Sequence, residues 1–393
     1  MIRWLVGAIG LSLAVSHALA AEPLEIGIGY LGHTGVKSKL SLVEQPAEND
    51  GMAGARLAIE DNNTTGKFLN QHFTLEAVRL KPDDDVAKAA VALAGHNGFI
   101  IADLPADALL KAADALRDRG TVLLNAGAID DRLREQDCRA NVIHVAPTRT
   151  MLADALAQYL VWKQWKRWLL VAGSHDTDKL YADAFRRAAT RFGAKIVQER
   201  TFEDTGGARR TDSGVTLIQR QMPVFTQQAP TYDVLVAADE SEVFASYLPY
   251  RTWDPRPVAG SAGLVPTSWD AAQDQWGAVQ MQNRFLKLNS RRMTALDMQA
   301  WTAARIIGEA TSRTNSDDPK TVFSFIKGPD FSVAAFKGTP LTLRDWNLQL
   351  RQPILLVDGR MVVSVSPQEG FLHQVSELDT LGLDRPETKC KLQ

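Results

Sequence analysis

The stretch GFIIADLPADALLKAADALRDRGTVLLN, residues 98–125, contains one complete strand–helix–strand unit. Residues 98–102 and 121–125 are short apolar runs of the kind that form buried strands. Residues 106–119 between them have the length and apolar spacing of a helix, and Gly120 supplies its C-terminal cap. Two buried strands joined by a helix predict neighbouring parallel strands with helices on the faces of the sheet.

The same alternation extends in both directions from this unit. Before it we expect a strand over 24–31, a helix over 47–62, a strand over 73–80 and a helix over 86–95. The pattern restarts near residue 148, with helices over 150–162, 181–192 and 215–221 and strands over 168–172, 195–201 and 232–237. The chain therefore predicts two doubly wound parallel sheets rather than one.

The last third of the chain has a different pattern. An amphipathic helix is expected over 294–312, followed by strands over 341–344, 349–357 and 361–365. The Asp358-Gly359 pair predicts a tight hairpin turn between the last two strands. Residues 367–393 form a polar tail with little periodicity, which we expect to pack back onto the body.

The first twenty residues are typical of a cleaved signal peptide. Arg3 precedes an apolar run over 5–15, and Ala18-Leu19-Ala20 gives the small-x-small pattern of a cleavage site. The run is too short to span a bilayer, so we expect no direct membrane insertion. Of the 393 residues, 373 would remain in the mature chain, which is enough for two domains exported to the periplasm.

The net charge and the two cysteines bear on which partners and which covalent bonds to expect. The formal net charge of −2 gives no reason to expect nucleic acid as a partner. The two cysteines, Cys138 and Cys390, could form one disulfide in an oxidising compartment, and two buried free thiols are the alternative.

Two motifs resemble signatures of cofactor binding or catalysis, but each lacks the neighbouring structure or residues that the signature requires. Gly27 to Gly32 match G-x-G-x-x-G, but these glycines lie inside the first expected strand instead of between a strand and a helix. Residues 260–263 resemble a nucleophile elbow, but the only downstream histidine, His373, lies in the irregular tail. We therefore expect a protein that is not an enzyme.

Several landmarks, taken in order, resemble the type I periplasmic binding proteins of the branched-chain amino acid family. They are the strand over 24–29, the segment 51–62, the segment 141–148, the segment 181–185 and the segment 336–341. Residues 346–354 and 367–373 are similar to a subgroup that accompanies PQQ-dependent alcohol oxidation systems. The resemblance covers nearly the whole mature chain up to about residue 366.

The resemblance implies an α/β fold of two doubly wound parallel-sheet lobes joined by a three-crossing hinge. It implies the following organisation: signal peptide 1–20, lobe 1 over 22–147 and 279–336, lobe 2 over 148–278 and 337–366, and a tail over 367–393. It further implies a periplasmic protein, expected to be a monomer, that captures a small molecule between its lobes and delivers it to the permease of an ABC transporter. A sensor component without transport is the alternative.

In such folds the ligand contacts loops at the carboxyl ends of the strands. The corresponding candidates here are Asp103, Asp107, Asn125, Ala126, Asp130, Asp176, Asp178, Asp239 and Glu240. By the resemblance, the loop over 103–107 lacks the usual Ser/Thr hydroxyl, and the loop around Gly260-Ser261 lacks the carboxylate that binds an amino acid's ammonium group. We therefore expect a ligand other than a standard amino acid.

Six of these candidates are acidic and come from both lobes. They are Asp103, Asp130, Asp176, Asp178, Asp239 and Glu240. Converging carboxylates repel each other unless a cation lies among them, which raises the possibility of a hard metal ion such as a lanthanide or calcium. The alternative is that the aspartates cap helix N-termini.

Overall fold

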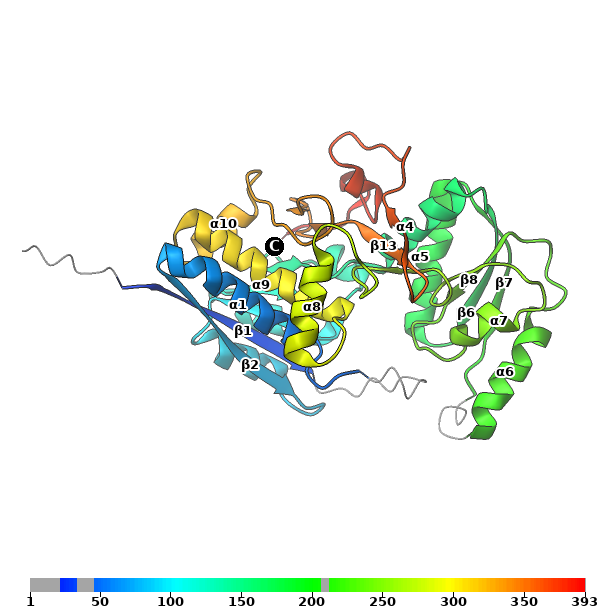
Figure 1. Cartoon of the computed structure of the whole chain (residues 1–393), viewed down its shortest axis with the longest axis horizontal. Helices are drawn as coiled ribbons and strands as arrows, with labels where there is room; N and C mark the ends of the chain where they lie inside the picture. Colours follow the sequence, from blue (N-terminus) through cyan, green and yellow to red (C-terminus); the bar gives the residue numbers. More distant parts are fainter. Residues whose placement is uncertain (1–21, 34–45, 206–211, 393) are drawn as a thin grey trace, which may run out of the picture.

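The computed structural model describes residues 22–33, 46–205 and 212–392. The predicted signal peptide lies outside these residues. Figure 1 shows two α/β lobes side by side, with the last segments of the chain along one side of their junction. None of the helices in the described part of the chain is long and apolar enough to cross a membrane.

Lobe 1 is built on a five-stranded parallel sheet with the order β2-β1-β3-β4-β5. Its strands are β1 (Leu24–His33), β2 (Gln71–Leu80), β3 (Phe99–Asp103), β4 (Val122–Asn125) and β5 (Val142–His144). One face is covered by α1 (Met52–Leu69), α8 (Ala278–Asn289), α9 (Ala295–Thr314) and α10 (Pro319–Ile326). The other face is covered by α2 (Val86–Ala94) and α3 (Ala106–Leu116). Alternate strand residues face the two helical layers, so the sheet is buried on both sides, as its apolar strands require.

Lobe 2 repeats this plan with a four-stranded parallel sheet, β7-β6-β8-β9. Its strands are β6 (Arg167–Gly173), β7 (Lys195–Phe202), β8 (Val234–Ala238) and β9 (Val258–Gly260). One face packs on α4 (Arg149–Trp162) and α5 (Asp176–Phe192). The other face of the sheet packs on α6 (Asp212–Thr226) and α7 (Leu248–Arg251). Both sheets are doubly wound, so the predicted fold class is confirmed.

Three segments connect the lobes. The chain leaves lobe 1 after β5, returns after β10 (Val265–Thr267), and crosses again between β12 (Leu350–Arg351) and β13 (Ile354–Val357). Leu341 and Leu350 belong to the core of lobe 1, whereas Ile354 belongs to that of lobe 2. The third crossing from lobe 1 to lobe 2 therefore lies at residues 352–353, between Leu350 of one core and Ile354 of the other.

A small antiparallel sheet and the tail complete the molecule. β10, β13 and β14 (Val362–Ser366) form that sheet, and the predicted turn at Asp358-Gly359 joins β13 to β14. The two-stranded ladder of β11 (Thr342–Leu343) and β12 lies next to it along the chain. The tail contains the 3-10 turns η3 (Glu377–Thr380) and η4 (Arg385–Glu387).

Buried ion pairs hold the tail on the body. Asp379 of η3 is fully buried and accepts hydrogen bonds at 2.9 Å from Nε of both Arg344 and Arg351. Cys138, in lobe 1, is joined by a disulfide to Cys390, with their Cα atoms 5.7 Å apart. The tail is therefore an ordered part of the fold over its described length.

Some elements differ from the sequence prediction. The predicted strand over 349–357 is two strands, because Pro353 has no N–H to donate to a ladder. Helix α5 begins at Asp176, five residues before the predicted start. Helices α8 and α10 were not predicted at all.

Candidate functional site

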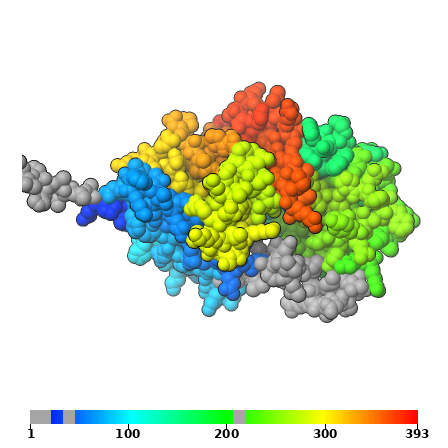
Figure 2. All heavy atoms as spheres, in the orientation of Figure 1, coloured from blue at the N-terminus to red at the C-terminus, as the bar shows by residue number. Residues whose placement is uncertain are grey.

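The candidate site lies at the carboxyl ends of the central strands of the two lobes. These ends are β3 and β4 in lobe 1 and β6 and β8 in lobe 2. In Figure 2 the surface is hollowed between the yellow part of lobe 1 and the green lobe 2, beside the orange segment. Loops at such ends are where open α/β sheets bind ligands.

In lobe 1, Asn125 shapes the turn after β4 rather than facing a ligand. Its side chain is fully buried. Its Oδ1 accepts from the N–H groups of Gly127 and Ala128 at 3.2 and 2.9 Å, and its Nδ2 donates to the carbonyl of Ala128 at 2.8 Å. This leaves Ala126 equally buried inside the turn. Both predicted binding residues therefore hold the backbone of the turn.

Asp103 at the end of β3 is only partly buried, and it lies close to this turn. The Tyr30 hydroxyl lies 3.3 Å from its Oδ2, and a Cβ added to Gly127 would lie 2.6 Å from its Oδ1. A side chain at residue 127 would therefore push the Asp103 carboxylate out of its position. Burial, followed by the charge of Asp103, raises the pKa of Tyr30 well above its ordinary value, so the hydroxyl keeps its proton to donate.

Asp107 lies away from this group. It is in the first turn of α3, its side chain is largely exposed, and Arg132 pairs with it. A carboxylate in the first turn of a helix is favoured by the helix dipole. The structure thus gives Asp107 the role of stabilising the helix start.

In lobe 2, Asp178 and Asp239 are buried caps. Asp178 belongs to the capping box of α5 and accepts from the Ser241 N–H at 2.8 Å. Asp239 accepts from the N–H groups of residues 243, 244 and 245 at 2.9, 2.8 and 2.7 Å. Burial raises the pKa of the Asp239 carboxyl even though these N–H groups favour its charged form. Both carboxylates accept hydrogen bonds from backbone N–H groups of lobe 2, as the capping alternative expected.

Arg149 joins the two lobes, and the sequence reasoning missed it. It begins α4 in lobe 2, and its guanidinium is 4% exposed. Its Nε and one terminal nitrogen donate to the two carboxylate oxygens of Glu240 at 2.6 and 2.7 Å, and the other lies 3.2 Å from Oδ1 of Asp130 in lobe 1. Burial lowers the pKa of Arg149, but the bonds and charge of Glu240 and Asp130 outweigh it, so the net direction is upward.

A signal for Arg149 was present in the sequence. A cation at the first position of a helix faces the positive end of the dipole, and so it needs carboxylates close by. Thr148 marks that helix start, because its hydroxyl accepts from the N–H of Met151 at 3.1 Å. Asp130 and Glu240 therefore do come together across the lobes, but around an arginine.

The structure does not bring the six acidic candidates into one group. The Asp176 side chain is 96% exposed and pairs with Lys179, Asp178 and Asp239 are caps, and Asp130 and Glu240 bind Arg149. Among the described residues, no three His, Cys, Asp or Glu side chains lie close enough together to hold a metal ion. The expected convergence is therefore wrong for this arrangement of the lobes, and a bound metal stays a prediction.

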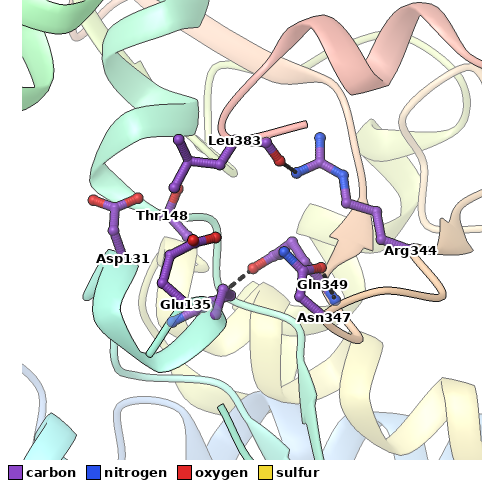
Figure 3. Close-up of a pocket in the computed structure, with 8 residues that line it drawn as sticks. Asp131, Glu135, Thr148, Arg344, Asn347, Gln349 and Leu383 are labelled. Atoms are coloured by element: carbon purple, nitrogen blue, oxygen red, sulfur yellow. Dashed lines mark hydrogen bonds between the residues drawn. The ribbon is translucent and has the colours of Figure 1, made fainter. Parts of the chain in front are cut away.

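The first and third crossings of the hinge are tightly packed where the described residues of the tail meet them. The cavity at this place has a volume of only about 10 Å³. Figure 3 shows the residues that line it, with Arg344 donating to the carbonyl of Leu383. Gln349, fully buried, donates to the carbonyls of His144 and Ala146 at 3.1 Å and accepts from Nε of Arg134 at 2.8 Å. These bonds tie the crossings to each other, so the lobes meet at a well-defined joint.

The two catalytic look-alikes have structural roles. Gly260 has φ of +101°, and a Cβ there would lie 2.2 Å from the carbonyl oxygen of Ala237, so only glycine fits. The Ser261 hydroxyl accepts from the N–H of Asp239 at 2.8 Å and therefore supports a turn. Residues 27–32 lie within β1.

Comparisons with known proteins agree with this geometry. The periplasmic binding protein family matches residues 40–212. A search of curated proteins found no match. The matched segment includes α1 to β5 of lobe 1 and α4 to β7 of lobe 2, and it covers less than half of the 393 residues.

Solved structures extend the likeness to nearly the whole chain. A periplasmic binding protein from Burkholderia mallei is 15% identical with a TM-score of 0.64, over 95% of this chain and 100% of that one. A leucine-, isoleucine-, valine-, threonine- and alanine-binding protein from Brucella ovis, in a closed conformation, is 14% identical with a TM-score of 0.66, over 95% and 100%. A solute-binding protein of an ABC transporter from R. palustris, in complex with benzoate, is 13% identical with a TM-score of 0.63, over 94% and 100%. At these identities the likeness establishes the fold, which is that of the type I periplasmic binding proteins.

Proposed function

We propose that this protein captures a small solute between its lobes and delivers it to the permease of an ABC transporter. The observation that carries the proposal is the bridge from Arg149 to Asp130 in one lobe and Glu240 in the other. It lies where strand-end loops of both lobes meet. A ligand held there would contact both lobes and favour their closure about the hinge.

The class of relatives supports the transport role. The matched family is described as periplasmic binding proteins, and the compared structures include an amino-acid-binding protein and a solute-binding protein of an ABC transporter in complex with benzoate. The sequence pattern of residues 1–20 supports export to the periplasm. The protein would then act as a binder and not as an enzyme.

The ligand we propose is not a standard amino acid. Asp103 and Asp107 stand in the loop where the family keeps its Ser/Thr hydroxyls. The polar groups offered near the lobe junction are the carboxylates of Asp103, Asp130 and Glu240 and the guanidinium of Arg149. These groups suit a small polar solute whose hydrogen-bond donor or cationic group would contact the carboxylates of lobe 1. The proposed link to PQQ-dependent alcohol oxidation rests on residues 346–354 and 367–373.

The direct test is mass spectrometry of protein purified from its native periplasm without denaturation. We expect a small molecule retained at a stoichiometry near one, and its loss from the Asp103→Ala and Glu240→Gln variants. Asp183→Asn is the matched control, because Asp183 is an exposed carboxylate paired with Arg186 on the outer part of α5. Absence of any retained solute, together with no thermal stabilisation by a metabolite panel, would refute the proposal.

A further inference from the structure

A second cavity lies beside the hinge, and it shares no lining residue with the candidate site. Its volume is about 350 Å³. It is lined by residues of the 337–339 loop, of the third crossing, of the end of β14 and of the tail near η3, where the orange and red segments of Figure 1 lie. Known ligand pockets begin at roughly 300 Å³, so a small molecule would fit.

The wall of this cavity includes a buried cation. Lys337 is 4% exposed. Its Nζ donates to Oε1 of Gln352 at 2.6 Å, and Nε2 of the same amide donates to the carbonyl of Val145 at 2.6 Å. The partner of the ammonium is thus a neutral amide. Among the described residues, no carboxylate forms an ion pair with Lys337. A buried ammonium without a counter-ion is costly, and this cost is the first argument for an anionic ligand.

Burial acts on the ionisation of this amine as well. It lowers the pKa of Lys337 to about 7, with no compensating charge nearby. An anion bound beside Nζ would favour the protonated form and so would be accompanied by proton uptake. Glu377 is the other charged side chain that lines the cavity, and it is exposed.

The remaining walls supply apolar surface and hydroxyl groups. The Trp276 ring lies against the 337–339 loop so closely that a Cβ on Gly338 would lie 2.5 Å from it. Pro353 and Pro367 add two rigid apolar edges, and Thr339 and Ser376 add hydroxyls. One cation, apolar walls and a few hydroxyls suit a carboxylate with a short hydrocarbon body better than a phosphate, which is commonly bound by several donors.

We propose that this cavity is a second binding site, separate from the interlobe site, for a small organic carboxylate held by Lys337. An occupant would contact the third crossing and the tail at once. It would therefore bias the angle at which the lobes open, because the crossing at residues 352–353 lies in its wall.

The test is isothermal titration calorimetry of the full-length mature protein with hexanoate at pH 6, where Lys337 is protonated. We expect millimolar or tighter binding, weakened by about tenfold or more in Lys337→Met. Glu377→Gln should tighten binding by about threefold, since it removes a negative charge from the same cavity. Lys327→Met is the control for removing a lysine, because Lys327 is exposed and packs over Phe323.

Two further probes define the chemistry. 1-Hexanol, which has the hydrocarbon body without the charge, should bind at least about tenfold more weakly, and so should inorganic phosphate. Equal binding of hexanol, or hexanoate binding that survives Lys337→Met, would overturn the proposal, as would no hexanoate binding by the wild type. If Lys337→Met fails to fold, Glu377→Gln still tests the site, because its side chain is exposed; unchanged affinity there would count against the site. Retention of the native solute by the Lys337→Met protein separates this result from the interlobe function.

Discussion

Asp239 and Asp103 occupy equivalent places in the two lobes, directly after β8 and at the end of β3. Asp239 is 1% exposed and binds three backbone N–H groups, whereas Asp103 is half-buried and faces a tyrosine hydroxyl. The same residue type at the same position is thus a cap in one lobe and a candidate ligand contact in the other. The difference arises from the following loop: residues 243–245 of lobe 2 turn their N–H groups back to the strand end.

The largest expected effect is on stability, at Asp239. Asp239→Ala leaves three buried N–H groups without an acceptor, and we expect a loss of about 3 kcal/mol in the free energy of unfolding. Asp103→Ala should cost less than about 1 kcal/mol, because its side chain is partly solvated. Urea denaturation of both variants measures the contrast. Equal losses would break the comparison between the lobes.

The second prediction concerns the residue that joins the two strand ends. Arg149→Met leaves Glu240 and Asp130 without their shared cation, and we expect a loss of about 2 kcal/mol. The double variant Arg149→Met with Glu240→Gln should recover part of this loss, because it no longer contains the unpaired carboxylate of Glu240. A double-mutant cycle by urea denaturation gives the coupling energy. Additive effects would show that the bridge contributes nothing specific.

Lys337 extends the comparison to a buried cation without a counter-ion. Because its amine titrates near pH 7 in the fold and near 10.5 in the unfolded chain, the unfolded chain holds more protons between these values. Rising pH over that range therefore stabilises the native state, by at most about 1.4 kcal/mol per pH unit from this group. Relative to Lys337→Met, the wild type should gain stability from pH 7 to 9 in urea denaturation. A flat difference would contradict the predicted desolvation of the amine.

The smallest effect is expected at Asp176. Its side chain is exposed and pairs with Lys179 one turn along the helix, so Asp176→Asn should change stability by less than about 0.5 kcal/mol. The metal hypothesis predicts that La³⁺ raises the melting temperature of the wild type and that Asp103→Ala abolishes this rise. An unchanged melting temperature with both Ca²⁺ and La³⁺ would refute it, in line with the absence of a metal-binding group among the described residues.

The fold was largely predictable from the sequence because buried parallel strands and helices have distinct lengths and spacings. The expected strands over 98–102 and 121–125 match β3 and β4 within a residue or two. Of the missed helices, α10 is only eight residues long and half of the residues of α8 are polar, and the two pack against α9 and α1 respectively in the fold.

The candidate site was predictable only in its location. The periodicity of the sequence predicts where strands end, and this made Asp103, Asp130 and Glu240 candidate site residues. Whether an aspartate caps or remains available depends on donors that come from later residues, as Ser241 does for Asp178. The burial of Arg149 and Lys337 depends on segments far away in the chain, although the place of Arg149 at a helix start did indicate that carboxylates lie nearby.

The bond between Cys138 and Cys390 closes a covalent ring of the chain, since 252 positions separate the two residues. All of lobe 2 and all three crossings lie within that ring. A single proteolytic cut anywhere between the two cysteines would leave one covalently connected molecule under oxidising conditions, and reduction would then release two pieces. The bond thus fixes both ends of the ring to lobe 1, whatever the angle between the lobes.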